Sequence, residues 1–169
     1  MQFKKSVIKS KNLKKKEILK ICNLKNKHWK YGTKSQKNWF FQNCKKNDIH
    51  YLVFFKNNLI GYLHLAVKNL LIKSKKKKYV LFRNLIVDKK FRSIGVAEKI
   101  MFFANNYIKK QKKIGFLVCK FQLIKFYKKY GWQRYSKKQI NLSDHRHNKM
   151  FFMLLNCKEK KKISFFYKP

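Results

Sequence analysis

The stretch from Tyr79 to Ala97 constrains the fold of this chain more than any other part of the sequence. Its first half, Tyr79–Val87, is a nearly continuous apolar run that predicts a buried β-strand. The sequence Arg-x-x-Gly-x-Ala follows at 92–97, and apolar residues at helical spacing continue from Val96 to about Lys110. A helix N-terminus offers unpaired N–H groups and partial positive charge, and Gly95 lets the backbone approach a ligand closely. This strand–turn–helix unit therefore predicts a site for a pyrophosphate.

The remaining apolar patterns predict a chain with alternating helices and strands. A helix is expected within Lys11–Trp29, and Ser35 is expected to cap a second helix with Trp39, Phe40 and Phe41 on its inner face. The runs Ile49–Phe55 and Leu59–Val67 predict a β-hairpin, and the basic stretch 68–78 predicts a solvated loop. Three more strands and one helix complete the pattern, with the strands at Ile114–Cys119, Trp132–Tyr135 and Met150–Leu155 and the helix at Gln122–Tyr130.

This order predicts an α/β fold in the broad sense, an α+β arrangement with helices on both faces of a central mixed sheet. The 169 residues contain no linker rich in proline, glycine or serine and no internal repeat, so a single domain over 1–169 is expected. The tail 158–169 begins with basic residues and ends with aromatic ones, and is expected either to pack on the domain or to fray.

The net charge of +39 admits two interpretations. Forty-five basic residues face six acidic ones, which is typical of a protein that binds nucleic acid or another polyanion. Only four of the basic residues are arginine, at 83, 92, 134 and 146, whereas base-reading interfaces rely on arginine. The lysines are spread along the whole chain among many Asn, Ile and Phe residues, which indicates biased coding composition. On either interpretation, the positive electrostatic field of the protein attracts anionic ligands.

The cysteines and apolar runs indicate a cytoplasmic protein. The four cysteines lie far apart, and no Cys-x-x-Cys motif or Cys/His pair with zinc spacing occurs, so reduced thiols and no metal are expected. The N-terminal 16 residues lack the apolar core of a secretory signal. The longest purely apolar run, Met150–Leu155, has six residues and is too short to span a bilayer.

Three segments of this chain together resemble the GNAT acetyltransferase superfamily. The turn within Leu85–Ala97 is similar to that family's acyl-CoA motif, Gln/Arg-x-x-Gly-x-Gly/Ala. The sequence Leu-Ile-Gly-Tyr at 59–62 is similar to the family's third strand, and Phe-Tyr-Lys-Lys-Tyr-Gly-Trp at 126–132 resembles its second signature. The three segments occur in the family's order and span about half of the chain. The chain departs from the pattern at Lys89, where proline is common, at Ser93, where glycine is usual, and at Lys120, where many members have an asparagine that holds the pantetheine arm.

The resemblance implies a GNAT-like acyl-CoA N-acyltransferase fold, with acetyl-CoA or another acyl-CoA as the donor. In the family, backbone groups of the strand bind the pantetheine arm, and the turn binds the pyrophosphate through N–H groups. The implied pantetheine residues are Leu85, Ile86 and Val87, and the implied pyrophosphate residues are Arg92, Ser93, Ile94, Gly95, Val96 and Ala97. The cofactor would lie between the strand that ends at Val87 and the strand at Ile114–Cys119.

The resemblance also implies direct transfer of the acyl group to an amine. Tyr127 matches the family residue that protonates the departing CoA thiolate, and a phenol is a suitable acid for that step. No general base is assigned. The titratable candidates are Asp48, His50, His64, Asp144, His145 and His147.

The acceptor expected from the charge is a neutral or anionic small molecule, such as an amino sugar or nucleotide-linked sugar, because a polycation would be repelled. The aromatic and histidine-containing region from Trp29 to His50 resembles GNAT members linked to surface-polysaccharide synthesis. The alternative function is a lysine-rich domain that binds nucleic acid or another polyanion without catalysis. Oligomeric state is left open.

Overall fold

The computed structural model describes residues 2–143, 150–159 and 162–166. The chain divides into two compact units, which we call unit 1 and unit 2. Unit 1 comprises Met1–Ala66 and Arg83–Met101, and unit 2 comprises Val67–Phe82 and Phe102–Pro169. Two strands and one helix have residues in both units. The single domain expected from the sequence stays a prediction.

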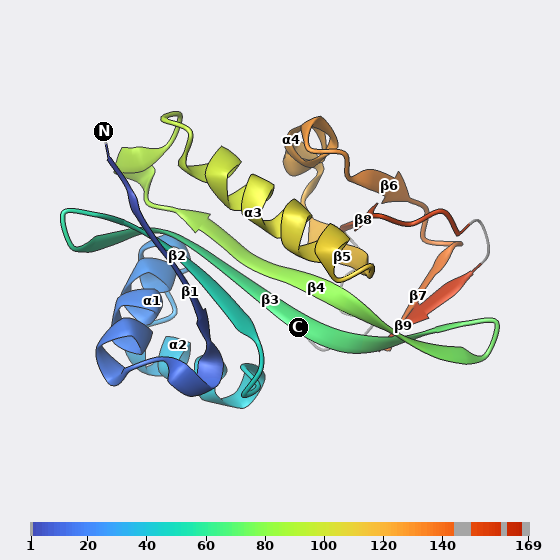
Figure 1. Ribbon diagram of the computed structural model, residues 1–169, viewed down its shortest axis with the longest axis horizontal. Helices are drawn as coiled ribbons and strands as arrows, with labels where there is room; N and C mark the ends of the chain where they lie inside the picture. The colour runs from blue at the N-terminus through green and yellow to red at the C-terminus, as the bar shows by residue number, and fades with distance from the viewer. Residues whose placement is uncertain (1, 144–149, 160–161, 167–169) are drawn as a thin grey trace. The chain divides into compact units, whose positions relative to one another are not determined.

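Unit 1 contains an antiparallel sheet that begins at the N-terminal strand. β1 (Lys4–Lys9) pairs with β2 (Ile49–Phe55), and β2 pairs with the first part of β3 (Asn58–Ile72). The last residues of β4 (Lys75–Val87) lie next to β3 in the strand order. Figure 1 shows these strands side by side.

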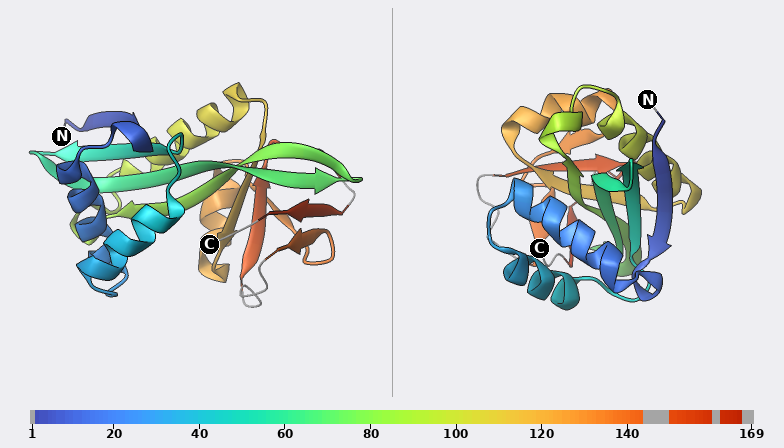
Figure 2. Two further views of the ribbon diagram at one scale, coloured as in Figure 1. Left: turned by 90° about the horizontal axis from the view of Figure 1, so that it is seen from below. Right: turned by 90° about the vertical axis from the view of Figure 1, so that its left-hand side faces the viewer.

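Helices cover both faces of the sheet in unit 1. α1 (Lys15–His28) and α2 (Thr33–Asn43) cover one face, where Leu52 and Tyr62 are buried beneath them. The next residues along the strands point to the opposite face because side chains alternate along a strand. Gly61 lies there beneath the first turns of α3 (Val96–Lys110). Figure 2 shows α1 and α2 along one side of these strands.

The glycine at position 61 permits the close approach of α3 to the sheet. A Cβ atom there would lie 2.8 Å from Cγ1 of Val96 and 3.1 Å from Cδ1 of Ile100. Such distances are too short for van der Waals contact, so any larger residue would push the first turn of α3 away from β3. Gly61 thus fixes where the helix N-terminus lies relative to β3.

Unit 2 contains the parallel pair that makes the sheet mixed. Tyr79–Leu81 of β4 pairs in parallel with Ile114–Phe116 of β5 (Ile114–Cys119), and β5 pairs antiparallel with β8 (Phe151–Leu155). The described residues of the unit also form α4 (Ile124–Lys129), β6 (Gln133–Tyr135), β7 (Ile140–Leu142) and β9 (Ile163–Phe165). β6 pairs with β8, whereas β9 pairs with both β3 and β7.

The core of unit 2 contains a cluster of aromatic rings among aliphatic side chains. Phe116 stacks on Phe165 with a centroid distance of 4.2 Å, and Tyr79 contacts both rings edge-on. On β5 the neighbouring Gly115 leaves room for Ile108 of α3 and for the ring of Trp132. The mixed α/β architecture expected from the sequence is confirmed.

Several sequence predictions need correction. The stretch 68–78 is not a loop, because β3 continues to Ile72 and β4 begins at Lys75, with a two-residue turn at Lys73 and Ser74 in left-handed conformation. Lysines fit there because this end of the hairpin is largely exposed. Ser35 lies inside α2, which is capped by Gly32, and Phe41 is 69% exposed rather than on the inner face. β1, β7 and β9 are short strands that the sequence did not reveal, and β9 lies in the expected tail.

No helix among the described residues is both long enough and apolar enough to cross a lipid bilayer.

Candidate active site

The turn between β4 and α3 is anchored by Asp88. Its backbone N–H donates to the carbonyl of Ile60 at 2.8 Å, which ties the end of β4 to β3. Its carboxylate accepts a hydrogen bond from the N–H of Lys90 at 3.2 Å and caps the short 3₁₀ turn Lys89–Phe91. The turn is therefore held at its first residue by both main chain and side chain.

Two left-handed residues complete the turn before α3 begins. Ser93 has a φ of 63° and Gly95 a φ of 81°. The carbonyl of Gly95 accepts a hydrogen bond from the N–H of Lys99 at 3.1 Å, so Gly95 is the N-cap of α3. The N–H groups of Val96 and Ala97, in the first turn, have no partner within the helix. This geometry suits an anion, and the pyrophosphate site expected from the sequence stays a prediction.

Asn84 is a functional candidate that the sequence analysis missed. It has a φ of 54° within β4, and its side-chain Nδ2 is buried without a hydrogen-bond partner in the described part of the chain. A left-handed residue distorts the strand just before Leu85, Ile86 and Val87, the predicted pantetheine residues. The sequence feature that could have revealed Asn84 is its residue type, because asparagine tolerates left-handed backbone better than most residues do.

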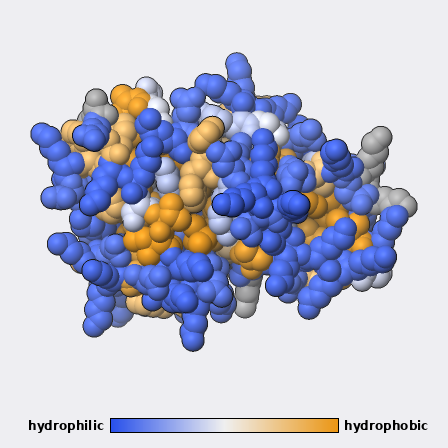
Figure 3. All heavy atoms as spheres, viewed as in Figure 1, coloured by the Kyte–Doolittle hydropathy of each residue, from blue (hydrophilic) through white to orange (hydrophobic). Residues whose placement is uncertain are grey.

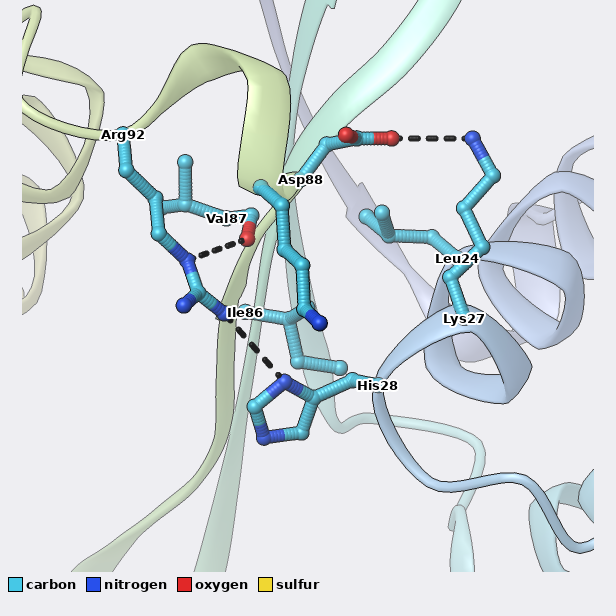
Figure 4. Close-up of a pocket in the computed structure, with 8 residues that line it drawn as sticks. Leu24, Lys27, His28, Ile86, Val87, Asp88 and Arg92 are labelled. Atoms are coloured by element: carbon cyan, nitrogen blue, oxygen red, sulfur yellow. Dashed lines mark hydrogen bonds and ion pairs between the residues drawn. The ribbon is translucent and has the colours of Figure 1, made fainter.

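A pocket in unit 1 adjoins this turn, and we call it the open pocket (Figure 4). Three residues of α1 and five residues at the end of β4 and in the turn line it: Leu24, Lys27, His28, Ile86, Val87, Asp88, Lys89 and Arg92. Lys27 forms an ion pair with Asp88 at 2.8 Å. The hydrogen bond from Lys27 lowers the pKa of Asp88, so this carboxyl is ionised.

The Arg92 guanidinium makes two long contacts in the open pocket. Its Nε lies 3.4 Å from the carbonyl oxygen of Val87, and its Nη2 lies 3.5 Å from Nδ1 of His28. Both distances are at the outer limit of hydrogen bonding. The predicted phosphate-binding arginine therefore faces the pocket and is held there only weakly.

Tyr127, the predicted acid, is buried in unit 2. Its ring packs edge-on against Phe82 at 5.9 Å and lies 6.3 Å from Trp132. Trp132 is fixed by a hydrogen bond from its Nε1 to Oδ1 of Asn105. Burial raises the pKa of Tyr127, with a smaller contribution from Cys119, so the phenol is protonated at neutral pH. A protonated phenol is the form that an acid requires.

The base candidates Asp48, His50 and His64 lie together in the interior of unit 1. Oδ2 of Asp48 lies 3.0 Å from Nε2 of His64, and the two histidine rings stack at 4.9 Å. His50 also hydrogen-bonds Ser10 and Tyr62 through its two ring nitrogens, at 2.7 and 2.9 Å. We call these five residues the closed cluster. The other three candidates, Asp144, His145 and His147, lie outside the described residues.

Burial governs the protonation of the closed cluster. Burial, together with a smaller contribution from the neighbouring His64, lowers the pKa of His50 to about 3, although Asp48 acts in the opposite direction. Burial also lowers the pKa of His64, although the hydrogen bond with Asp48 acts in the opposite direction. Both histidines are fully buried and neutral at physiological pH, and neither ring is accessible to a substrate.

A metal ion does not fit the one suitable group of ligands among the described residues. Donor atoms of Cys44, His50 and His64 lie within 4.8 Å of one another. However, both His50 nitrogens already have partners, and the two rings are parallel to within 1°. In-plane lone pairs of parallel rings do not converge on one ion. Burial also raises the pKa of Cys44 to about 12, which disfavours the thiolate that metals bind.

Comparisons with known proteins show the family and the fold of the chain. The family model for the acetyltransferase (GNAT) domain matches residues 18–152. Among curated proteins, none matches the chain. Solved structures share the fold: an acyl-CoA N-acyltransferase from Pseudomonas aeruginosa is 14% identical, with a TM-score of 0.68 over 90% of this chain and 99% of that one.

Two Escherichia coli structures are also similar. The GNAT family N-acetyltransferase YhbS, solved in complex with CoA, is 10% identical, with a TM-score of 0.68 over 98% of this chain and 92% of its own. The ribosomal-protein-S18-alanine N-acetyltransferase is 9% identical, with a TM-score of 0.63 over 90% of this chain and 93% of its own. At these identities the likeness concerns the fold, whereas the family model covers most of the sequence. The chain therefore belongs to the GNAT family of acetyltransferases.

Proposed function

We propose that this enzyme transfers an acetyl group, or another acyl group, from acyl-CoA to the amine of a small acceptor in the cytoplasm. The observation that carries the proposal is the turn from Arg92 to Gly95, which opens α3 with unpaired N–H groups and places an arginine beside them. A pyrophosphate matches both features, because it accepts hydrogen bonds from backbone N–H groups and charge-assisted bonds from a guanidinium.

The rest of the predicted site has supporting features. The left-handed Asn84 interrupts the regular strand immediately before Leu85–Val87, so the backbone groups there are directed differently from those of a regular ladder. Tyr127 supplies a protonated phenol for the departing thiolate. We propose Leu85–Val87 and Arg92–Ala97 as the cofactor site and Tyr127 as the acid.

The acceptor we propose is neutral or anionic, such as an amino sugar or a nucleotide-linked sugar. The open pocket presents cationic side chains of Lys27, Lys89 and Arg92, and its one carboxylate, Asp88, is already neutralised by Lys27. A polycationic peptide would be repelled by this pocket and by the net charge of +39.

Acetyl-CoA binding, measured by calorimetry at moderate salt, tests the cofactor site. Gly95→Trp is the test variant and Gly32→Trp its matched control. Both glycines are helix N-caps with φ near +80°, each accepts the first helical hydrogen bond at 3.1 Å, and neither has an atom within 4 Å of its missing Cβ. Each substitution therefore places a side chain at a positive φ, where the backbone is strained.

Only Gly95→Trp should weaken acetyl-CoA binding, by tenfold or more, which corresponds to about 1.4 kcal/mol. Equal binding by both variants would contradict the proposed cofactor site. The affinity of the wild type for acetyl-CoA should fall only modestly when the salt concentration rises from 50 to 300 mM, because directed hydrogen bonds supply part of that affinity.

The alternative function, a polyanion-binding domain without catalysis, predicts that the binding affinity depends strongly on salt concentration. Binding carried by scattered lysines falls steeply with ionic strength. The face shown in Figure 3 has hydrophilic side chains over all its parts, interrupted by apolar patches, rather than one continuous stripe. This distribution supports the interpretation that the chain is an enzyme and that its positive charge comes from biased composition.

A further inference from the structure

Tyr127, the proposed acid, lies on a helix that is too short to hold its own position. α4 has six residues, and an isolated helix of that length is not stable in water. Just after the helix, the N–H groups of Tyr130 and Trp132 donate to the carbonyl of Tyr127 at 3.0 and 3.3 Å. The position of Tyr127 therefore depends on what holds the residues that follow α4.

Asn105 of α3 holds these residues through both ends of its side-chain amide. Its Nδ2 donates to the carbonyl of Tyr130 at 2.7 Å, and its Oδ1 accepts from Nε1 of Trp132 at 3.0 Å. The two bonds join residues that are 25 and 27 positions apart in the chain, so they are tertiary contacts between neighbouring helices (Figure 1). One amide thus holds main chain on one side and an aromatic ring on the other.

The indole that Asn105 holds packs in turn against the ring of the acid. Phe82, Tyr127 and Trp132 form three edge-on pairs, with centroid distances between 5.4 and 6.3 Å, and all three rings belong to unit 2. Tyr127 and Trp132 are both buried. In such a packed core, a shift of the indole would leave a void beside the phenol or push against it. Asn105 therefore acts on Tyr127 both through the helix backbone and through the indole.

We propose that Asn105 is a positioning residue for the acid, which holds the phenol of Tyr127 where the departing thiolate can take its proton. This inference rests on the proposed function. A general acid works within hydrogen-bond reach of the atom that it protonates, and a displacement of about 1 Å removes much of its effect. The bond changes are those of the proposed transfer, and Asn105 neither gives nor takes a proton.

The contribution of the CoA thiol to binding distinguishes positioning from a purely structural role. An amide that only stabilised unit 2 would change the affinity for every CoA derivative alike, or for none. A positioning amide changes the affinity for CoA but not for desulfo-CoA, which lacks the thiol. We define the thiol preference as the dissociation constant of desulfo-CoA divided by that of CoA.

Calorimetry with CoA and desulfo-CoA as probes measures the thiol preference. The wild type should bind CoA about fivefold more tightly, the scale of one hydrogen bond between the phenol and the sulfur. Tyr127→Phe, which lacks the hydroxyl, should lose this preference. Asn105→Leu should lose most of it as well, while its affinity for desulfo-CoA stays within about twofold of the wild-type value.

Two further variants keep the test specific. Asn106→Leu is the matched control, because it makes the same substitution at the next residue of α3, which is exposed, and it should keep the full thiol preference. Asn105→Asp serves where Asn105→Leu does not fold. Its carboxylate still accepts from Trp132 but no longer donates to Tyr130, so it should lose part of the preference.

A double variant tests whether Asn105 acts through Tyr127. In the Tyr127→Phe background, Asn105→Leu should leave the thiol preference unchanged, because residues that act as a unit are not additive. A further loss in that background would mean that Asn105 acts by another route, and overturns the inference.

The outcomes separate the inference from the proposed function. An Asn105→Leu variant that keeps the thiol preference, or that loses affinity for both probes alike, overturns the inference alone. A wild type without the preference, or a Tyr127→Phe variant that keeps it, overturns the proposed acid and the inference with it. A wild type that binds neither probe overturns the proposed cofactor site and the inference with it.

Discussion

The closed cluster and the open pocket contain similar side chains, but they differ in burial and in the length of their hydrogen bonds. In the closed cluster, His50 and His64 are fully buried, their hydrogen bonds are 2.7–3.0 Å long, and burial keeps both rings neutral. In the open pocket, His28 is exposed and its contact with Arg92 is 3.5 Å long. Short buried bonds hold a structure, whereas long exposed ones can be exchanged for a ligand. The surroundings of a histidine therefore decide whether its ring is held in the core or can be reached from solvent.

The largest effect should come from removing the carboxylate of the closed cluster. Asp48→Ala leaves Nε2 of His64 and the N–H of Lys45 without the acceptor they share. We expect a loss of about 3 kcal/mol in the free energy of unfolding, measured with urea at pH 7.5. Asp88→Ala in the open pocket removes an exposed ion pair and a turn cap, and should cost only about 1 kcal/mol. Equal losses would contradict the distinction between the two regions.

Acid should destabilise the protein through the closed cluster. His50 titrates with a pKa of about 3 in the folded protein and about 6.5 when unfolded. Its contribution is therefore full above pH 6.5 and is lost as the pH falls toward 3, because the unfolded chain binds the proton first. We expect the free energy of unfolding to drop by about 2 kcal/mol between pH 8 and pH 5.

Two glutamine variants locate the origin of this acid sensitivity. His50→Gln should flatten the dependence of the unfolding free energy on pH, whereas Asn23→Gln, which changes an exposed residue of α1 without a titratable side chain, should leave it unchanged. A profile that stays steep in His50→Gln would mean that the acid sensitivity does not come from His50.

A buried lysine beside the closed cluster should give a smaller effect of opposite sign. Lys25 is 3% exposed, and burial lowers its pKa to about 8. Its Nζ lies 3.5 Å from the ring centroid of Trp39, so a cation–π contact offsets part of the desolvation. Lys25→Met should raise the free energy of unfolding by about 1 kcal/mol at pH 7.

The advantage of Lys25→Met should depend on pH in a defined direction. In the wild type, the folded protein releases the Lys25 proton near pH 8 and the unfolded chain near pH 10.5. Wild-type stability therefore rises between these values, and the advantage of the methionine variant should shrink over the same window. Unfolding curves at pH 7 and pH 9.5 measure it, and an advantage that grows with pH would contradict the assignment.

The smallest effect is expected for the ion pair in the open pocket. Lys27 is 69% exposed in its side chain, so solvent screens its attraction to Asp88. A double-mutant cycle with Lys27→Ala and Asp88→Asn should give a coupling energy of about 0.5 kcal/mol, and less in 0.5 M salt. A coupling above 2 kcal/mol would mean that the pocket is closed in solution.

The sequence predicted the elements with strong periodicity and the turn that follows β4. α3 begins and ends at the expected residues, Val96 and Lys110, because its apolar spacing and the preceding glycine are local signals. The basic hairpin arm was missed because lysines in an exposed strand look like loop residues, and the arm is specified by long-range pairing with β9. Short strands such as β7 and β9 have too few residues to show a period.

In the candidate site, too, some residues are specified by the local sequence and others come together only through distant parts of the chain. Arg92–Ala97 form one contiguous motif, so the sequence alone could predict them as site residues. His28 has no motif around it, and it comes next to Arg92 only through the packing of α1 beside β4, 64 residues away along the chain. The sequence also could not show that Asp48, His50 and His64 are closed off, since burial is a property of the assembled fold.

The burial of Lys25 also affects whether the enzyme acylates its own lysine side chains. A protein that binds a reactive thioester and carries more than forty lysines risks acylating itself, and an amine reacts only when deprotonated. With a pKa of about 8, Lys25 is deprotonated far more often at neutral pH than an ordinary lysine. Its nitrogen lies over Trp39 and is almost inaccessible, so the packing that makes this amine nucleophilic also shields it from the thioester.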